Sequence, residues 1–256
     1  MTDPQSIGIV EQKEYTFAEA PNALQLDCGA ALGPITIAYE TYGELNADRS
    51  NAILITHALS GDAHAAGRHS EEDKKSGWWD DMIGPGKAFD TNQFCVISSN
   101  VLGGCQGSTG PSSTNPETGN TFGLDFPIIT VADMVRAQWE LIRHLKIEKL
   151  VCIAGGSMGG MQVLEWITLY PDLMRSAMVI ASTHRSGAQQ IAFDAVGRNA
   201  IQADPRFKGG QYTDDDVPAN GLAIARMLAH ITYLSEEGMH GKFGRDLQGA
   251  DKFQYE

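Results

Sequence analysis

One short segment has the residue types and the spacing of a serine nucleophile site. Residues 155–159 read Gly-Gly-Ser-Met-Gly, with a glycine two positions before and two positions after Ser157. This pattern is typical of a tight turn from a strand into a helix, in which the hydroxyl projects above the sheet at the positive end of the helix. The segment therefore predicts that Ser157 attacks an acyl carbon. The alternative is a glycine-rich turn whose serine only caps the helix.

Acyl transfer also requires backbone N–H groups that stabilise the negatively charged oxygen of the intermediate. The N–H of Met158, directly after the nucleophile, is the first candidate. The second is the N–H of Leu59, in a His-Ala-Leu-Ser-Gly segment that follows the apolar run 51–56. His57 begins that segment and has the chemistry of a base. A histidine at a strand end more often orients its loop, however, and the usual chain order of such sites places the base after the serine. We therefore expect His57 to be structural.

Two other segments carry reactive residue types without a complete motif. Residues 100–111 are rich in glycine but lack the Gly-Lys-Ser/Thr ending of a phosphate-binding loop, so we interpret them as an irregular pocket wall. Cys105 in this segment has no nucleophile signature and is expected to be a buried or half-buried thiol. Arg226 lies in a mostly apolar helical stretch, where it either extends to solvent or binds a buried anion; the pattern leaves both open. His230, one turn later, is expected to be a satisfied histidine of the core or its rim.

The elements that must position these residues alternate between strands and helices. Short, almost wholly apolar runs predict strands covered on both faces, and apolar residues at helical spacing predict helices between them. This alternation indicates a mostly parallel sheet with helices on both faces, and two leading antiparallel strands make the sheet mixed. The predicted strands are residues 23–28, 35–42, 51–56, 94–98, 149–154 and 177–181, and the predicted helices are residues 131–145, 158–170, 188–203 and 219–234.

The last part of the chain differs from the rest. After residue 183 the sequence has helical patterns separated by a polar stretch, and no strand signal returns before residue 256. We therefore expect a strand-and-helix core over residues 1–183 and a helical insertion over residues 184–256.

The composition excludes several classes of partner. The 256 residues include 32 acidic and 19 basic side chains, a net charge of −13, so no basic face is expected for nucleic acid or an anionic membrane. No window approaches the roughly 18 apolar residues of a membrane span, and the N-terminus lacks an apolar run of the signal-peptide type. The four cysteines are scattered without CxxC spacing, which predicts reduced thiols and no structural zinc. These features predict a cytoplasmic protein.

With these residues in hand, the chain resembles the homoserine O-acetyltransferases of the α/β-hydrolase superfamily over essentially its whole length. The resemblance is carried by Thr-His-Ala-Leu-Ser-Gly-Asp-Ala-His at 56–64, Asn-Val-Leu-Gly-Gly at 100–104, Gly-Gly-Ser-Met-Gly-Gly-Met at 155–161, Ala-Arg-Met at 225–227 and His-Ile-Thr-Tyr-Leu-Ser at 230–235.

The resemblance implies an α/β-hydrolase fold with the start of a helical lid, and a two-step acyl transfer. Ser157 would take the acetyl group from acetyl-CoA, and the hydroxyl of L-homoserine would then attack the acyl-enzyme, in methionine biosynthesis. Met158 and Leu59 would supply the oxyanion N–H groups, and Arg226 would bind the carboxylate of the amino-acid substrate. The resemblance also implies a homodimer, no tightly bound cofactor, and acetyl-CoA as co-substrate.

One departure from the family concerns the rest of the catalytic triad. In this family the triad Asp and His lie in a segment that follows the lid, and this sequence stops at Glu256, within the lid region. The resemblance therefore implies a C-terminally truncated copy whose core lacks the last strands. Several alternatives remain open: succinyl-CoA as donor, serine as acceptor, an esterase or thioesterase that uses water, and an inactive truncated chain that only binds a ligand or partner.

Overall fold

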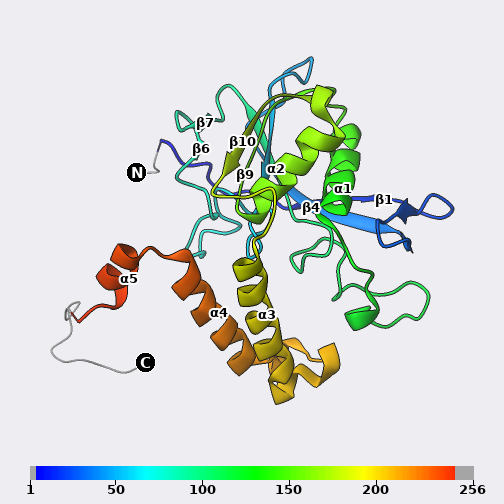
Figure 1. The fold of residues 1–256 in the computed structure, drawn as a ribbon. Coiled ribbons are helices and arrows are strands. Elements are labelled where there is room, and N and C mark those ends of the chain that lie inside the picture. The colour runs from blue at the N-terminus through cyan, green and yellow to red at the C-terminus, as the bar shows by residue number, and fades with distance from the viewer. Residues whose placement is uncertain (1–3, 246–256) are drawn as a thin grey trace. The chain divides into compact units, whose positions relative to one another are not determined.

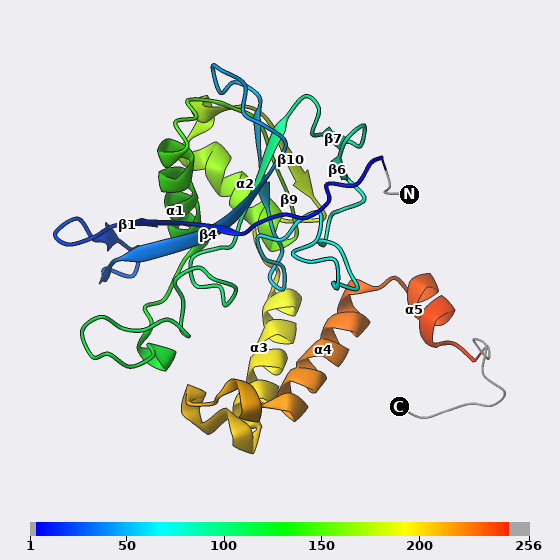
Figure 2. The same ribbon diagram turned by 180° about the vertical axis from the view of Figure 1, so that it is seen from behind.

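The computed structural model describes residues 4–245 and divides the chain into two compact units (Figures 1 and 2). The first unit, Met1–His184, contains all the strands found among the described residues, and the second, Arg185–Glu256, is helical in its described part, which ends at residue 245. Each unit is described by itself below. The function of the second unit as a lid stays a prediction.

The sheet of the first unit has six strands, in the order β1 (Lys13–Phe17), β4 (Ile35–Tyr42), β8 (Cys95–Ser99), β5 (Ala52–Thr56), β9 (Leu150–Gly156) and β10 (Met174–Ile180). The first two neighbour pairs in this order are antiparallel and the other three are parallel, which confirms the predicted mixed sheet. Thr56, at the end of β5, lies opposite Gly155, near the end of β9. The residues that follow these two strands therefore meet at the same end of the sheet, called here its carboxyl end.

Four strands of two residues each form two small pairs outside this sheet. They are β2 (Leu24–Gln25) with β3 (Ala31–Leu32), and β6 (Ile83–Gly84) with β7 (Phe89–Asp90). The prediction of a longer strand over residues 23–28 is therefore wrong. The antiparallel neighbour of β4 is β1, which the sequence did not predict, because β1 is an edge strand with mostly exposed positions whose apolar alternation is limited to Tyr15 and Phe17.

The two long helices of the first unit, α1 (Val131–His144) and α2 (Met158–Leu169), cover the same face of the sheet. Both connections, β8 to β9 and β9 to β10, run in one direction along the sheet, and right-handed crossovers then place both helices on one side. The connection from β5 to β8 runs in the other direction and covers the opposite face with irregular chain, β6 and β7. Helices α1 and α2 thus provide the predicted helical cover on one face of the sheet. The opposite face is covered by the chain between β5 and β8.

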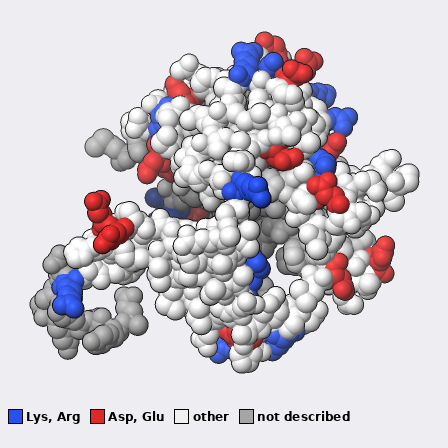
Figure 3. All heavy atoms as spheres, in the orientation of Figure 1, with Lys and Arg blue, Asp and Glu red and all other residues white. Residues whose placement is uncertain are grey.

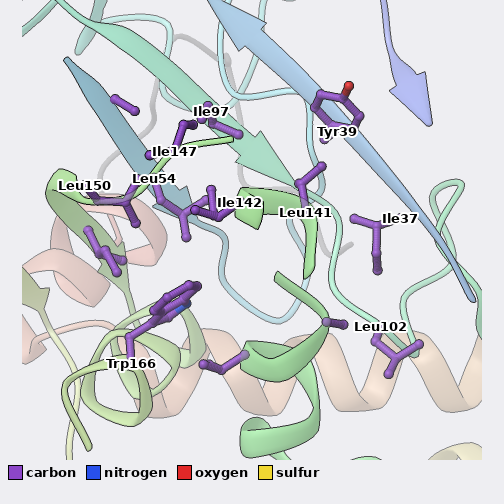
Figure 4. Packing of buried hydrophobic residues seen from close by; sticks show 14 of the residues in the cluster. Ile37, Tyr39, Leu54, Ile97, Leu102, Leu141, Ile142, Ile147, Leu150 and Trp166 are labelled. Atoms are coloured by element: carbon purple, nitrogen blue, oxygen red, sulfur yellow. The ribbon is translucent and has the colours of Figure 1, made fainter. Parts of the chain in front are cut away.

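The main core lies between this helical layer and the sheet. Side chains of Leu141 from α1 and Trp166 from α2 gather with strand residues such as Leu54 and Ile97 (Figure 4). A polar chain crosses this core: the Trp166 indole N–H donates to Gln138 Oε1 at 2.8 Å, and Gln138 Nε2 donates to Gln162 Oε1 at 2.7 Å. Because buried polar groups are costly unless satisfied, these bonds fix α2 against α1 in one register.

The second unit contains α3 (Ala188–Ala203), α4 (Ala219–Tyr233) and α5 (Glu236–Phe243). The first two were predicted from the sequence and are confirmed; α5 was not predicted. α3 and α4 pack closely, and the N–H of Gly221 donates to Asp204 Oδ2 at 2.9 Å. Single 3₁₀ segments lie at Gly123–Asp125, Pro171–Leu173, Pro205–Gly210 and Asp214–Asp216.

The surface carries mixed charge. On the face shown in Figure 3, Lys and Arg side chains are scattered among Asp and Glu side chains, with wide uncharged areas between them. Within residues 4–245, none of the helices combines the length and apolarity needed to cross a bilayer.

Candidate active site

Ser157 has the backbone of a strained turn between β9 and α2. Its φ is 57° and its ψ is −122°, a region that non-glycine residues rarely occupy. The N–H of Ser157 donates to Ile180 O at 3.0 Å, and the Ser182 hydroxyl donates to Ser157 O at 2.7 Å. The segment at the end of β10 therefore holds both backbone groups of Ser157. Ser157 is exposed, and its side chain makes no capping hydrogen bond to α2. This geometry favours a nucleophile over the capping alternative.

The glycines of the motif are required by close packing at this turn. A Cβ on Gly155 would collide with Thr56 Oγ1, and a Cβ on Gly159 would collide with the carbonyl oxygen of Thr56. Thr56 also donates from its hydroxyl to Gly159 O at 2.9 Å. The end of β5 therefore lies directly against the first turn of α2, which is possible only without side chains at these two positions.

His57 is buried, and both of its ring nitrogens are engaged. Nδ1 lies 2.7 Å from Ala58 O, and the N–H of Val101 donates to Nε2 at 3.1 Å. These partners require the neutral ring with its hydrogen on Nδ1. Burial lowers the pKa of His57 below its ordinary 6.5, and the hydrogen bond to Ala58 offsets part of this effect. His57 orients its loop, as the sequence analysis favoured, and is not placed to take a proton from Ser157.

The segment that follows β5 reaches the same end of the sheet as Ser157. The N–H of Gly61 donates to Ala58 O at 2.9 Å and closes a turn in which the Leu59 side chain is 78% exposed. Gln162 of α2 donates from Nε2 to His57 O at 3.2 Å, which attaches this segment to the helix. The N–H of Met158 belongs to the first turn of α2, where N–H groups have no intrahelical acceptor. Both predicted oxyanion donors thus lie in segments that pack together; their role stays a prediction.

The remaining predicted residues have different surroundings. Residues 100–111 begin at the carboxyl end of β8, and Cys105 within them is exposed, so the expected burial of this thiol is wrong. Arg226 is exposed on α4 of the second unit. His230 is half-buried, and its Nδ1 lies 2.9 Å from Arg226 O, which confirms a satisfied rim histidine. Within residues 4–245, the structure gives no hydrogen bond between the Ser157 hydroxyl and a histidine.

The sequence analysis missed a polar cluster on the opposite face of the sheet from α1 and α2. Glu40 and Tyr42 of β4 are fully buried there, His64 is half-buried, and His69 completes the cluster at the surface. The available signal was Glu40 itself, a charged residue two positions from Tyr42 and therefore on the same face of a buried strand. Its partners are 24 and 29 residues away in the sequence, so their contact is not visible from local patterns.

Comparison with known proteins agrees with the fold described above. A family profile described as alpha/beta hydrolase fold matches residues 51–247. The homoserine O-acetyltransferase of Methanococcoides burtonii is 56% identical over 98% of this chain and 51% of its own length, and the homoserine O-succinyltransferase of Magnetococcus marinus is 55% identical over 98% and 65%.

Two solved structures have the same fold. The homoserine O-acetyltransferase from Bacillus anthracis has a TM-score of 0.84 at 35% identity, over 94% of this chain and 65% of its own. The esterase E22 has a TM-score of 0.82 at 35% identity, over 91% and 64%. The chain spans about half to two thirds of the length of these relatives. Its resemblance to homoserine O-acetyltransferases is confirmed at the level of sequence, and the chain belongs to the α/β-hydrolase family.

Proposed function

We propose that this chain carries the nucleophile of a homoserine acyltransferase. The observation that carries the proposal is the positive φ of Ser157 at a strand-to-helix turn, with an exposed hydroxyl that is not used for capping. The names of the relatives at 55–56% identity support homoserine as the acceptor. Acetyl-CoA is the proposed donor, and it acts as a co-substrate, with no tightly bound cofactor.

The proposed reaction has two steps. Ser157 Oγ attacks the thioester carbonyl carbon, and the resulting oxyanion accepts hydrogen bonds from the N–H groups of Met158 and Leu59. Collapse of this intermediate expels the CoA thiol and leaves an ester on Ser157. The homoserine hydroxyl then attacks the carbonyl carbon of that ester and forms a second oxyanion. Collapse of this oxyanion releases O-acetylhomoserine and restores the serine.

Each step also moves a proton. The hydrogen of Ser157 Oγ must pass to a base and then to the departing thiol, and the hydrogen of the homoserine hydroxyl must return to the serine. His57 is not this base, because its Nε2 accepts a hydrogen bond from Val101 and its Nδ1 donates to Ala58. We therefore propose full turnover for a protein that also holds the Asp–His pair implied by the resemblance.

The proposal extends to the substrate and the setting. Arg226 binds the carboxylate of homoserine, because a guanidinium matches a carboxylate with two parallel hydrogen bonds. The second unit acts as a lid, the complete enzyme is a homodimer, and it works in the cytoplasm in methionine biosynthesis.

A second candidate function is ester hydrolysis, which the similarity to esterase E22 favours. The deciding experiment is intact-mass spectrometry of a protein that also holds the Asp–His pair implied by the resemblance, after incubation with acetyl-CoA or succinyl-CoA, followed by addition of homoserine, serine or buffer alone. We expect an acetyl adduct that homoserine discharges faster than water does, and no adduct in Ser157→Ala. Equal discharge by buffer would indicate an esterase, and an adduct that persists in Ser157→Ala would refute the nucleophile. The donor that forms the adduct faster decides between acetyl and succinyl.

A further inference from the structure

A fully buried carboxylate lies beside the segment that follows β5. Glu40 Oε2 accepts hydrogen bonds from the Tyr42 hydroxyl at 2.7 Å and from His64 Nδ1 at 3.1 Å, and Oε1 accepts from His69 Nε2 at 2.7 Å. An ionised carboxylate is only an acceptor, so both histidine nitrogens carry the hydrogen. These three donors compensate a group that would otherwise be costly to bury.

The same cluster holds the backbone of residues 63–65. The N–H of Ala65 donates to the Tyr42 oxygen at 2.7 Å, and Ala63 O lies 3.1 Å from that oxygen. His64, between them, is held by Glu40 through its side chain. Because the single hydroxyl hydrogen of Tyr42 goes to Glu40, the two side chains of β4 fasten His64 and Ala65, and Ala63 O lies close to the same hydroxyl.

The segment 57–66 is thus attached at both ends. Its first residue, His57, is fixed by Val101 and Gln162, and its far end is fixed by Glu40 and Tyr42. Leu59 lies between these attachments, in an exposed turn. A catalytic N–H has to be held within a fraction of an ångström of its working position, and a turn fastened at both ends is held more closely than one fastened at a single end.

We infer that Glu40 and Tyr42 are positioning residues for the oxyanion site, which hold the 57–66 segment so that the Leu59 N–H stays beside Ser157. They do not touch the substrate; they act through His64 and the backbone of residues 63–65. The assignment of Leu59 as a donor rests on the proposed function, whereas the attachment of the segment does not.

Glu40, His64 and His69 also have the residue types of a metal site. The ligand atoms of Glu40, His64 and His69 all lie within 4.8 Å of one another. Both carboxylate oxygens, however, already accept hydrogen bonds, and the two imidazole rings lie against each other with centroids 3.9 Å apart. The two rings are tilted by 39° to each other, whereas two imidazoles that bind one ion tetrahedrally are spread around it and are not in contact at this separation. The geometry therefore favours a hydrogen-bonded attachment.

Hydrogen exchange in the 256-residue chain tests the attachment without any catalysis. Tyr42→Phe removes the hydroxyl that bonds both Glu40 and Ala65, and we expect amide exchange in residues 57–66 to become about tenfold faster. The matched control is Tyr39→Phe, on the same strand but in the core cluster of the opposite face (Figure 4). It should leave this segment unchanged, and α1 should stay protected in both variants.

A second set of variants guards against loss of the fold. If α1 also loses protection in Tyr42→Phe, His64→Gln replaces it as the test, because His64 lies outside β4 and its removal breaks one bond to Glu40. Unchanged exchange in residues 57–66 of a folded variant overturns the inference. So does binding of one Zn²⁺ per chain that is lost in His69→Gln, since the cluster would then be a metal site.

The catalytic part is tested in the protein that also holds the Asp–His pair implied by the resemblance, by the rate at which acetyl-CoA acylates Ser157. We expect Tyr42→Phe to lower the limiting rate about tenfold, with the half-saturating concentration of acetyl-CoA unchanged, because an oxyanion contact forms only in the transition state. Tyr39→Phe should change neither value. Faster exchange with an unchanged acylation rate overturns the positioning role. Absence of any acyl-enzyme in the unaltered form of that protein contradicts the proposed function instead, and exchange alone then decides the attachment.

Discussion

At the scale of single residues, the proposed nucleophile Ser157 and the nearby His57 have clearly separated roles. Ser157 has an unfavourable backbone conformation that two hydrogen bonds, from its N–H to Ile180 O and from Ser182 to its carbonyl, keep in place. His57 is a histidine near this turn, but its two nitrogens are occupied by Ala58 and Val101. Residue type alone therefore does not identify a base, and hydrogen-bond partners decide it.

The buried ring of His57 predicts a dependence of stability on pH. Because the pKa of His57 is lowered by burial in the folded chain, the unfolded chain binds a proton there first as the pH falls below about 6.5. The contribution of the neutral His57 ring to the free energy of unfolding is therefore complete above that pH. It decreases as the pH falls towards the lowered pKa of the folded chain. Urea unfolding at a series of pH values should show this slope, and His57→Gln should reduce it. Equal slopes for the two proteins would contradict the prediction.

Arg226 gives a prediction about the two half-reactions of the complete enzyme. A charge-assisted contact to the acceptor carboxylate is worth about 1.5–3 kcal/mol. Arg226→Ala should therefore weaken the use of homoserine by roughly tenfold to a hundredfold, whereas acylation by acetyl-CoA should change much less. Stopped-flow measurement of each half-reaction separates the two effects. An equal loss in both would mean that Arg226, which is exposed on α4, has a structural role.

At the scale of elements, the sequence predicts those strands and helices whose own pattern is strong. β5 and β8 are buried at every position, and both are apolar up to the hydroxyl residues at their ends, Thr56 in β5 and Ser98 with Ser99 in β8. The capping box of Thr130 and Asp133 locates the start of α1, and the structure contains both of its bonds. β1 escapes prediction because an edge strand has an exposed face and no strict alternation. The Glu40 cluster escapes because its members come together only through the fold.

The start of α1 provides a prediction about stability. Asp133 is buried, and it accepts hydrogen bonds from the N–H of Thr130 at 3.0 Å and from the N–H of Asp27 at 3.1 Å. Asp133→Ala leaves these groups without a partner and should lower the free energy of unfolding by about 1–3 kcal/mol. Glu140→Ala, which removes a solvent-exposed pair with Arg143 on the same helix, should cost less than about 1 kcal/mol. Urea unfolding of both variants compares them, and equal costs would contradict the prediction.

At the scale of the whole molecule, the sheet ends on one side at an apolar edge. β10 is the last strand of the six, and Met178, Val179 and Ile180 are each more than a third exposed. An unpaired strand edge with apolar side chains is a template for association with another chain. The first unit thus has a well-buried core and one edge strand, β10, to which a strand of another chain can pair.

This edge predicts the behaviour of the chain in solution. We expect the 256-residue chain to associate at tens of micromolar, and Val179→Lys, which places a charge on an edge residue that is 40% exposed, to reduce that association. Ile167→Lys changes a side chain that is 41% exposed on α2 and should have little effect. Sedimentation velocity at several concentrations measures both. A parent chain that sediments as a monodisperse monomer would refute the prediction.

The contact between the end of β5 and the first turn of α2 also determines at which stage of folding Ser157 can adopt its strained conformation. Thr56 and Gly159, joined by a hydrogen bond, are 103 residues apart in the sequence, and the backbone of Ser157 depends on this non-local contact. Contacts of long sequence separation form late, because the chain between them must first be ordered. A growing or refolding chain therefore does not hold Ser157, the proposed nucleophile, in this conformation until the centre of its sheet has closed. We expect acylation of Ser157 to become possible only as folding is completed.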